Sequence, residues 1–415
     1  MDRNFHNYSA AEAKDGPRWA ERELAERDDA LEKRAGVDLP FLILTLIILM
    51  IGVVMVLSAS FARAYYTSGE PLGLFMRQLI FAVSGVAIML LVSRVRVGTM
   101  RRWSMYLLIA AIALLVLVLF IGVVRNNSRR WIDLGFTTFQ PSEIAKLAVI
   151  MSFSAMICSF GNKMKTLKYG IFPFVVITGL IVGLLVLEPH LSASVIIVTL
   201  AGIMMFAGGV RLRWFALAGM IAFLVVAAVV LPRFAAPSGG EAAPDGTQTQ
   251  THYASKRISA WLDPEADPQG AGFQIRHSLY AIGSGGLFGQ GLGQSRQKYL
   301  YLPEEHNDYI FAVVCEELGF IGAMLILVLF ALLIIRGFWL ALHAKDRYGS
   351  LVTTGITSLL AIQVFLNVAV VTNLVPATGI SLPFFSYGGT ALWIQLVQMG
   401  IILAVSRDIP LTKAG

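Results

Sequence analysis

Apolar segments of about 20 residues, the length that crosses the hydrocarbon core of a bilayer as a helix, restrict the fold of this sequence more than any other feature. Hydrophobic residues make up 56% of the 415 positions and charged residues only 14%, a balance that a soluble domain of this size does not need. We therefore predict an all-α polytopic membrane protein with ten spans, at residues 39–60, 72–92, 103–124, 142–160, 169–187, 191–209, 214–232, 309–335, 351–374 and 391–405.

The basic residues of the short loops predict the orientation of these spans, because cytoplasmic loops carry an excess of Lys and Arg. Both termini then lie in the cytoplasm as tails, residues 1–37 and 409–415, on either side of a membrane domain at residues 38–408. The one long loop, residues 233–307, is predicted on the outer side. The basic residues that give the net charge of +7 are scattered over short loops between apolar spans, so they do not indicate nucleic-acid binding. The cations that set the orientation are Arg94, Arg96, Arg101, Arg102, Lys163, Lys165, Lys168, Arg211, Arg213, Arg336, Lys345 and Arg347.

The second half of the long loop contains two distinctive segments. Residues 272–284 (GFQIRHSLYAIGS) carry apolar positions at helical spacing and predict a short interfacial helix. The glycine-dense residues 283–293 (GSGGLFGQGLG) follow. They could form a flexible linker, or a wall where a side chain would collide with a bound head group, and the sequence alone leaves both open.

Acidic residues are densest between Tyr299 and Gly319, around the start of the eighth predicted span. Ionisable groups at a membrane boundary are costly unless they are solvated, paired or functional. Asp308 lies directly before the apolar run, where it could be a catalytic carboxylate or simply the N-cap of the span. Glu316 and Glu317 lie about 12 Å deeper at 1.5 Å per residue, where they could bind a helix of the same chain instead of a substrate.

Four blocks of sequence carry a resemblance to a known family. In order they are residues 129–146 (RRWIDLGFTTFQPSEIAK), 261–273 (WLDPEADPQGAGF), 289–319 (GQGLGQSRQKYLYLPEEHNDYIFAVVCEELG) and 371–390 (VTNLVPATGISLPFFSYGGT). Through them, residues 38–408 resemble the SEDS family (shape, elongation, division and sporulation) of bacterial cell-wall polymerases. The residues before the Leu-Pro-Glu-x-His block are more similar to the division branch of the family than to the elongation branch.

The resemblance implies a fold and a function. The fold is a multi-span helical domain similar to GT-C transferases, and the activity is polymerisation of lipid II, an undecaprenyl-pyrophosphate-linked disaccharide pentapeptide, at the outer face of the inner membrane. The implied partners are a class B penicillin-binding protein that acts as transpeptidase and other divisome components, at the division septum. The sequence has no nucleotide-binding fingerprint and no Cys/His metal cluster, so we expect no required cofactor, although a divalent cation could assist.

Candidate site residues combine this resemblance with chemistry. Glycosyl transfer needs a base for the acceptor hydroxyl and positive charge for the departing diphosphate. Asp308 matches the family's catalytic aspartate, with Asn307 and Tyr309 at positions where the family usually has Thr and Phe. Glu143 and Lys146 share one face at the start of the fourth span, either as a self-neutralising pair or as a phosphate-binding cavity edge.

Further candidates flank these residues. Arg130 and Trp131 match the family's Arg-Trp block. Arg130, with Arg125 and Arg129, breaks the charge rule on the predicted outer side, so a contact with lipid pyrophosphate competes with a role as membrane anchors. Lys298 is a second candidate for the diphosphate. His306 could orient the acceptor or tune Asp308, or could simply be solvated.

At two places the sequence departs from the pattern that is usual in the family. Residues 188–192 read Glu-Pro-His-Leu-Ser where the family usually has Pro-Asp-x-Gly, so we assign no site residue there. Residues 381–390 end in Thr390 where serine is commoner. Two alternatives remain at this point, a lipid II flippase, which would also suit broken helices and midplane charges, and an elongation-type polymerase.

Overall fold

The computed structural model describes residues 36–125, 128–133, 135, 137–188, 190–211, 213–215, 257, 259–265, 270–299 and 301–409 of the chain. Most of the predicted span at 214–232 and the start of the long loop lie outside these residues. Within the described part, eight helical stretches are long and apolar enough to cross a membrane, and a ninth, α8, is shorter. The main helices are α2 (Leu39–Ser68), α3 (Gly73–Val92), α4 (Val97–Ile121), α5 (Pro141–Phe160), α7 (Phe172–Leu187), α8 (Leu191–Ala207), α12 (Ile310–Leu342), α13 (Arg347–Val371) and α14 (Gly389–Ser406).

The all-helical prediction is confirmed for the body of the molecule, and each predicted span except the one at 214–232 coincides with one of these helices. Two of them continue past their apolar runs. α2 continues to Ser68, and α12 continues to Leu342. Short helices also occur at α6 (Leu167–Gly170), α11 (Ala271–Gly285) and the 3-10 turn η2 (Gly161–Lys165).

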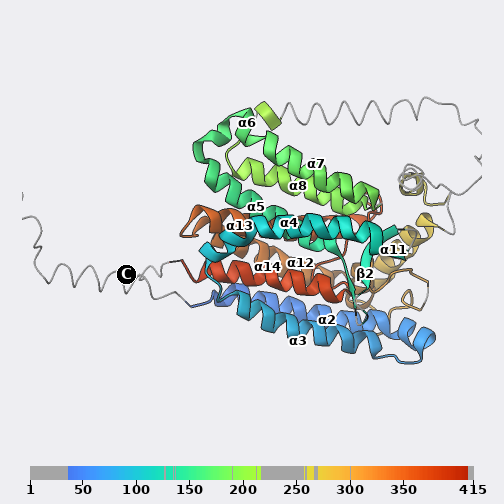
Figure 1. Ribbon diagram of the computed structural model, residues 1–415. Coiled ribbons are helices and arrows are strands. Elements are labelled where there is room, and N and C mark those ends of the chain that lie inside the picture. Colours follow the sequence, from blue (N-terminus) through green and yellow to red (C-terminus); the bar gives the residue numbers. More distant parts are fainter. Residues whose placement is uncertain are drawn as a thin grey trace, which may run out of the picture.

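The long helices run side by side in one bundle (Figure 1). α3 packs on α14, α4 on α5, α7 on α8, and α12 on both α2 and α13. One hydrophobic core joins α2, α3 and α12 to α14, and a second joins α4, α5, α7 and α8. The charged start of α2 is fixed by Asp38, which accepts a hydrogen bond from the backbone N–H of Phe41 and pairs with Arg336 of α12.

A small antiparallel sheet interrupts the helical pattern at one end of the bundle. Its strands are β1 (Val123–Arg125), β2 (Ser128–Asp133) and β3 (Thr138–Phe139), in the order β1-β2-β3. This sheet was not among the predicted elements, because strands of two to six residues carry little periodic signal. The sheet brings Arg130 and Trp131, which lie on β2, to the same end of the bundle as α11 (Figure 1).

α12 is kinked at Gly319, whose φ of 67° and ψ of −171° are not helical. The glycine-rich loop replaces the helical bonds that the kink removes. The backbone N–H groups of Gln290 and Gly291 donate to the carbonyls of Glu316 and Glu317 at 2.9 and 3.0 Å. The N–H groups of Phe320 and Ile321 donate to the carbonyls of Gly286 and Leu287 at 2.9 and 3.1 Å.

This pairing explains why Gly289 and Gly319 carry no side chain. A Cβ on Gly289 would lie 2.2 Å from the carbonyl oxygen of Glu317, and a Cβ on Gly319 would lie 2.2 Å from the backbone nitrogen of Gly289. The linker interpretation is therefore wrong for this segment. At these two positions a side chain would collide with backbone atoms of the facing segment.

Candidate active site

A polar cavity of about 650 Å³ opens where α2, α3, β2, α5 and the loops before α12 and α14 converge. Pockets for small molecules typically enclose about 300–1,000 Å³, so this one is large enough for a sizeable ligand. Of the predicted site residues, it brings six together, and Lys298 is not among the residues that line it. The six are Arg130, Trp131, Glu143, Lys146, His306 and Asp308.

Asp308 lies in the cavity wall, and its carboxylate does not cap α12. The helix begins at Ile310, its N-cap position is Tyr309, and no side chain caps it. Asn367 holds the backbone at this point by donating to the carbonyl of Asp308 at 2.9 Å and to that of Ile380 at 2.7 Å. The contact with α13 therefore fixes where the carboxylate points, and the simple capping interpretation does not hold.

Burial and neighbouring charges set the acidity of Asp308. Burial, together with the nearby Glu304 carboxylate, raises the pKa of its carboxyl group from 3.8 to about 6. Arg257, His306 and Arg130 oppose the shift. The amide of Asn307 donates to Glu304 at 2.7 Å, so the residue that departs from the family pattern holds this second carboxylate in place. A carboxylate with a pKa close to neutral is suited to accept a proton.

Glu143 and Lys146 form the predicted pair at the start of α5. Their charged atoms are 2.8 Å apart, Lys146 is only 3% exposed, and both residues line the cavity. α5 begins at Pro141, which is suited to a first helical turn, so the pair lies where the helix enters the bundle. The ion pair and the cavity edge, which the sequence presented as alternatives, therefore coexist.

Arg130 reaches the cavity from β2, and its Nε donates to the carbonyl of Glu188 at 3.4 Å. Trp131 also lines the cavity, whereas Arg129 is exposed and directed to the carbonyl of Leu119. One of the three arginines that break the charge rule is thus a cavity residue. Arg130 and Asp308 line the same cavity, and the charge of Arg130 opposes the rise in the pKa of Asp308.

His306 is buried, with 8% of its surface exposed, so the interpretation of a simply solvated histidine is wrong. Its Nδ1 lies 3.6 Å from the carboxylate of Glu305, and its ring contacts the ring of Tyr387. Glu305 in turn pairs with Arg63 at 3.4 Å. This chain of contacts joins the loop before α12 to α2 and to the loop before α14.

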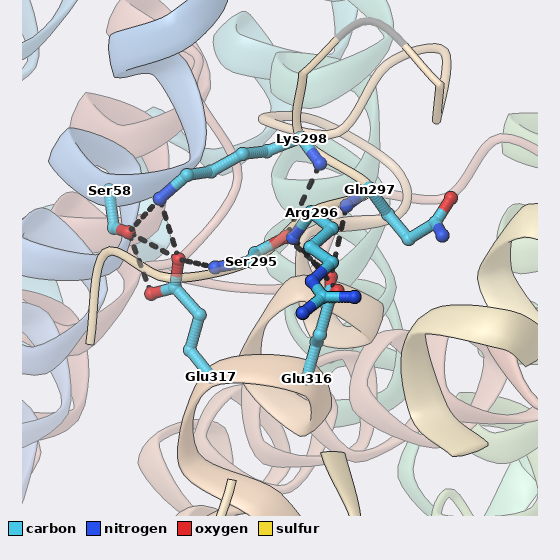
Figure 2. Close-up of polar contacts among 7 residues, drawn as sticks. All are labelled: Ser58, Ser295, Arg296, Gln297, Lys298, Glu316 and Glu317. Carbon is cyan, nitrogen blue, oxygen red and sulfur yellow. Dashed lines mark hydrogen bonds and ion pairs between the residues drawn. The ribbon is translucent and has the colours of Figure 1, made fainter. Parts of the chain in front are cut away.

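Lys298 lies in a different environment from the one predicted. It is 2% exposed, and its Nζ donates to Glu317 at 2.8 Å and to Ser58 of α2 at 3.2 Å. Figure 2 shows the ammonium group directed at Glu317 and Ser58. Since the lysine is enclosed in this ion pair outside the cavity, the geometry does not support its predicted contact with a diphosphate.

The neighbouring Glu316 binds the same loop. It accepts hydrogen bonds from the backbone N–H of Arg296 at 2.9 Å and of Gln297 at 3.4 Å, and from the hydroxyl of Ser295 (Figure 2). The carboxylates of Glu316 and Glu317 therefore bind residues of the same chain, which is one of the two roles that the sequence left open for them. They fasten residues 295–298, directly after the glycine-rich loop, to the kink of α12 and to α2.

Several cavity residues were not among the predicted site residues. His190 lines the cavity, and burial, together with Arg130 and Lys146, lowers its pKa to about 3, so the ring is neutral. Burial also raises the pKa of Glu188 to about 8, and neither of its carboxyl oxygens has a hydrogen-bond partner. The sequence signal for both residues was the segment 188–192, which departs from the family pattern and was assigned no site residue.

Two further arginines, Arg63 of α2 and Arg77 of α3, also line the cavity. Nothing in the sequence distinguished them from membrane anchors. Arg257 acts on Asp308 and donates to the carbonyl of Ala377, in the loop before α14. No group of three or more His, Cys, Asp or Glu side chains in the described residues is arranged to hold a metal ion.

Comparison with known proteins places these features in a family. A family model described as "Cell cycle protein", which covers FtsW, RodA and SpoVE, matches residues 39–409. Stage V sporulation protein E of Bacillus subtilis (strain 168) is 43% identical over 377 residues, which are 90% of this chain and 98% of that protein. A probable peptidoglycan glycosyltransferase FtsW of Trichlorobacter lovleyi is 39% identical over 379 residues, 91% of this chain and 95% of that protein.

Solved structures agree with the sequence relatives. A chain from a study of the structural coordination of polymerization and crosslinking by a peptidoglycan synthase complex superposes with a TM-score of 0.72, at 26% identity over 90% of this chain and 99% of that chain. The rod shape determining protein RodA of Thermus thermophilus superposes with a TM-score of 0.63, at 26% identity over 90% of this chain and 97% of that chain. The protein therefore belongs to the FtsW/RodA/SpoVE family, the SEDS family of polytopic membrane proteins.

Proposed function

We propose that this protein is a peptidoglycan glycosyltransferase that polymerises lipid II into glycan strands, with Asp308 as the general base. The observation that carries the proposal is one carboxylate, with a pKa near 6, in a cavity that also holds Arg130 and Lys146. The relatives named as probable peptidoglycan glycosyltransferases support the reaction class.

The reaction joins two lipid-linked sugars. The acceptor hydroxyl oxygen attacks the anomeric carbon of the donor, and the bond from that carbon to the diphosphate oxygen breaks. The hydroxyl proton passes to Asp308, and the lipid diphosphate leaves with the bonding electrons. A carboxyl group with a pKa of about 6 is mostly ionised at neutral pH and still accepts a proton as the new bond forms.

The leaving diphosphate needs positive charge as its own charge develops. Arg130 is suited to phosphate oxygens because its guanidinium presents several donors in a fixed fork. Lys146, held by Glu143 at 2.8 Å, supplies a positioned positive charge. His306, joined to Glu305, supports the loop that carries Asp308. We propose no resident cofactor, and a divalent cation would enter bound to the diphosphate.

The flippase alternative has weaker support. A transporter binds its substrate at broken helices whose freed backbone groups face the site. α12 is broken at Gly319, but its freed groups are bonded to residues 286, 287, 290 and 291 of the glycine-rich loop. A base with a matched pKa, in contrast, is what transfer of a glycosyl group requires.

For the biological role we propose septal synthesis at the bacterial inner membrane, with both termini in the cytoplasm and a class B penicillin-binding protein as partner. The similarity to FtsW proteins supports division, and the solved synthase complex supports a crosslinking partner. The 43% identity to a stage V sporulation protein makes a sporulation role the second candidate. A tagged copy at midcell in vegetative cells supports division, and a copy confined to sporulating cells refutes it.

The activity itself is tested with purified lipid II. We expect the protein, co-purified with its transpeptidase partner, to form glycan strands that a muramidase degrades. If no strands form and the protein instead transfers lipid II between the leaflets of a vesicle, its function is that of a flippase and the proposed polymerase activity is wrong.

A further inference from the structure

The start of α8 lines the cavity, and the reaction described above gives it no role. α8 packs against α5, α7 and α13, and it begins at the end of the bundle that carries β2 and α11 (Figure 1). Its N-cap residue His190 and two residues of its first turn, Ser192 and Ala193, all line the cavity. The first turn of this helix of 17 residues is therefore part of the cavity wall.

The backbone at this helix start carries donors that no helical bond uses. The first helical bond runs from the N–H of Ser194 to the carbonyl of His190 at 3.3 Å. Three N–H groups, those of Leu191, Ser192 and Ala193, precede it, and no side chain in the described part of the chain caps them. Free N–H groups and the helix dipole together give a helix start a partial positive charge, which favours an anion.

A buried side chain at the same helix start also lacks an acceptor. His190 is 7% exposed, and its Nδ1 has no hydrogen-bond partner among the described residues. Its Nε2 lies 3.4 Å from the amide nitrogen of Gln140, which can only donate, so Nε2 accepts and the proton of the neutral ring is on Nδ1. Because a buried donor without an acceptor is costly, the Nδ1–H of a cavity residue points to an acceptor on a ligand.

Two cations of the proposed reaction lie at the same corner of the cavity. The contact between Gln140 and His190 joins the N-cap positions of α5 and α8, so the two helices start side by side. Lys146 follows on α5 and lines the cavity. Arg130 of β2 lies against the chain just before α8, where its Nε donates to the carbonyl of Glu188 at 3.4 Å. The start of α8 and both cations therefore face one part of the cavity.

His190 is also the point at which the segment 188–192 departs from the family pattern. When the prolines are aligned, it takes the position of the aspartate in Pro-Asp-x-Gly. A carboxylate there would repel a phosphate, whereas a neutral imidazole N–H donates to one. Glu188 does not restore the negative charge, because burial raises the pKa of its carboxyl group to about 8 and keeps it mostly protonated at neutral pH.

We propose that the start of α8, with the Nδ1–H of His190 and the free N–H groups of the first turn, forms an anion subsite for one phosphate of the lipid diphosphate that leaves the donor. This inference rests on the proposed function, which assigns the same diphosphate to Arg130 and Lys146. The subsite adds uncharged donors in fixed positions, and such donors stabilise the charge that develops on a leaving group.

The test measures binding of the leaving group itself, without the reaction. Undecaprenyl diphosphate and undecaprenol are titrated separately into the full-length protein in detergent, and wild type should prefer the diphosphate by at least about tenfold. Equal affinity for the two would overturn the subsite. Strand synthesis from lipid II is read independently. A protein that forms strands but binds the diphosphate without His190 refutes the subsite alone, and one that binds it through His190 but forms no strands refutes the proposed polymerase alone.

Two amide variants separate the ring nitrogens of His190. The amide nitrogen in His190→Asn is as many bonds from Cα as Nδ1, and the amide nitrogen in His190→Gln is as many as Nε2. His190→Gln should weaken binding of the diphosphate about tenfold or more, the usual effect of a hydrogen bond to a charged group, while His190→Asn stays within about threefold of wild type. Equal affinities in the two variants would overturn the assignment to Nδ1.

His190→Phe adds a measurement that distinguishes binding from a structural role. It keeps a ring of similar size, and because Nδ1 has no partner in the free protein, the unfolding temperature without ligand should be unchanged or higher. Binding should fall as in His190→Gln. His343→Gln is the matched control, because His343 is exposed at the end of α12 and does not line the cavity. A lower unfolding temperature with normal binding in His190→Phe would make this histidine structural and overturn the proposal.

Discussion

Replacing Asp308 by asparagine separates catalysis from stability, because the structure predicts opposite effects on the two. The amide has nearly the size of the carboxyl group, so the contacts of the loop before α12 should persist. It cannot take up the acceptor proton at neutral pH, and general-base catalysis typically contributes about 10²- to 10⁴-fold. Polymerisation should therefore fall at least about a hundredfold.

The stability of the same variant should not fall. The carboxyl group of Asp308 has a pKa of about 6 in the folded protein against an ordinary value of 3.8. Because the folded state holds the proton more tightly, the ionised group destabilises the fold above about pH 6, and this cost disappears as the pH falls toward 4. At 1.36 kcal/mol per pH unit the difference amounts to at most about 3 kcal/mol. Solvent in the cavity reduces it further.

The assay combines strand synthesis with thermal unfolding in detergent, on wild type and variant co-purified with the partner. At pH 7.5 we expect the variant to be inactive and at least as stable as wild type, with the difference in stability vanishing near pH 4. In the wild-type protein, kcat/KM should decrease below about pH 6, as the base becomes protonated. Near-normal synthesis by Asp308→Asn, or a pH profile flat down to pH 4.5, would refute the role of Asp308 as base.

Three further predictions test the surroundings of the site and the topology. Lys298→Met should lower the unfolding temperature, because it leaves the buried Glu317 carboxylate without its charge partner, a change that typically costs about 3–5 kcal/mol. Adding Glu317→Gln should restore part of this stability. If Lys298→Met is instead stable but inactive, the lysine contacts the diphosphate after all. Replacing Glu143 by Leu together with Lys146 by Met should abolish strand synthesis at normal protein levels, since the lysine charge serves the diphosphate; retained activity would reduce the pair to a replaceable ion pair. Reporter fusions after residue 240 and at residue 415 should report opposite sides of the membrane, and the same side for both would contradict the predicted topology.

The outline of the fold could be predicted from hydropathy, because an apolar run of about 20 residues has few stable arrangements other than a spanning helix. The same rule explains what was missed. The sheet at residues 123–139 is too short for a periodic pattern, and its strands form because the chain must turn between α4 and α5 at the end of the bundle. The kink at Gly319 was also invisible, because its backbone bonds are replaced by a loop about 30 residues earlier in the chain.

In the candidate site, the sequence alone identified the charged residues that lie on one helix or within one motif. Glu143 and Lys146 are one helical turn apart, so their contact follows from helix geometry alone. The motif around Asp308 selected the carboxylate, but its pKa depends on Glu304, Arg257 and Arg130, two of which are far away in the sequence. The acidity of a group follows from its burial and from the distances to other charges, and only the folded chain sets these.

Lys298 and Arg77 show the limit of reading charges from sequence. Both are single cations next to apolar runs, and the sequence favoured the lysine because it lies ten residues before the base. The structure buries Lys298 against Glu317 and Ser58, and it brings Arg77, more than 200 residues before Asp308, to the cavity. The sequence determined which residues carry charge and which segments cross the membrane, because both follow from composition. Which charges neutralise each other and which remain available to a substrate was decided by the packing of helices distant in the chain, because a charge interacts with whatever lies within a few ångströms, whatever its position in the sequence.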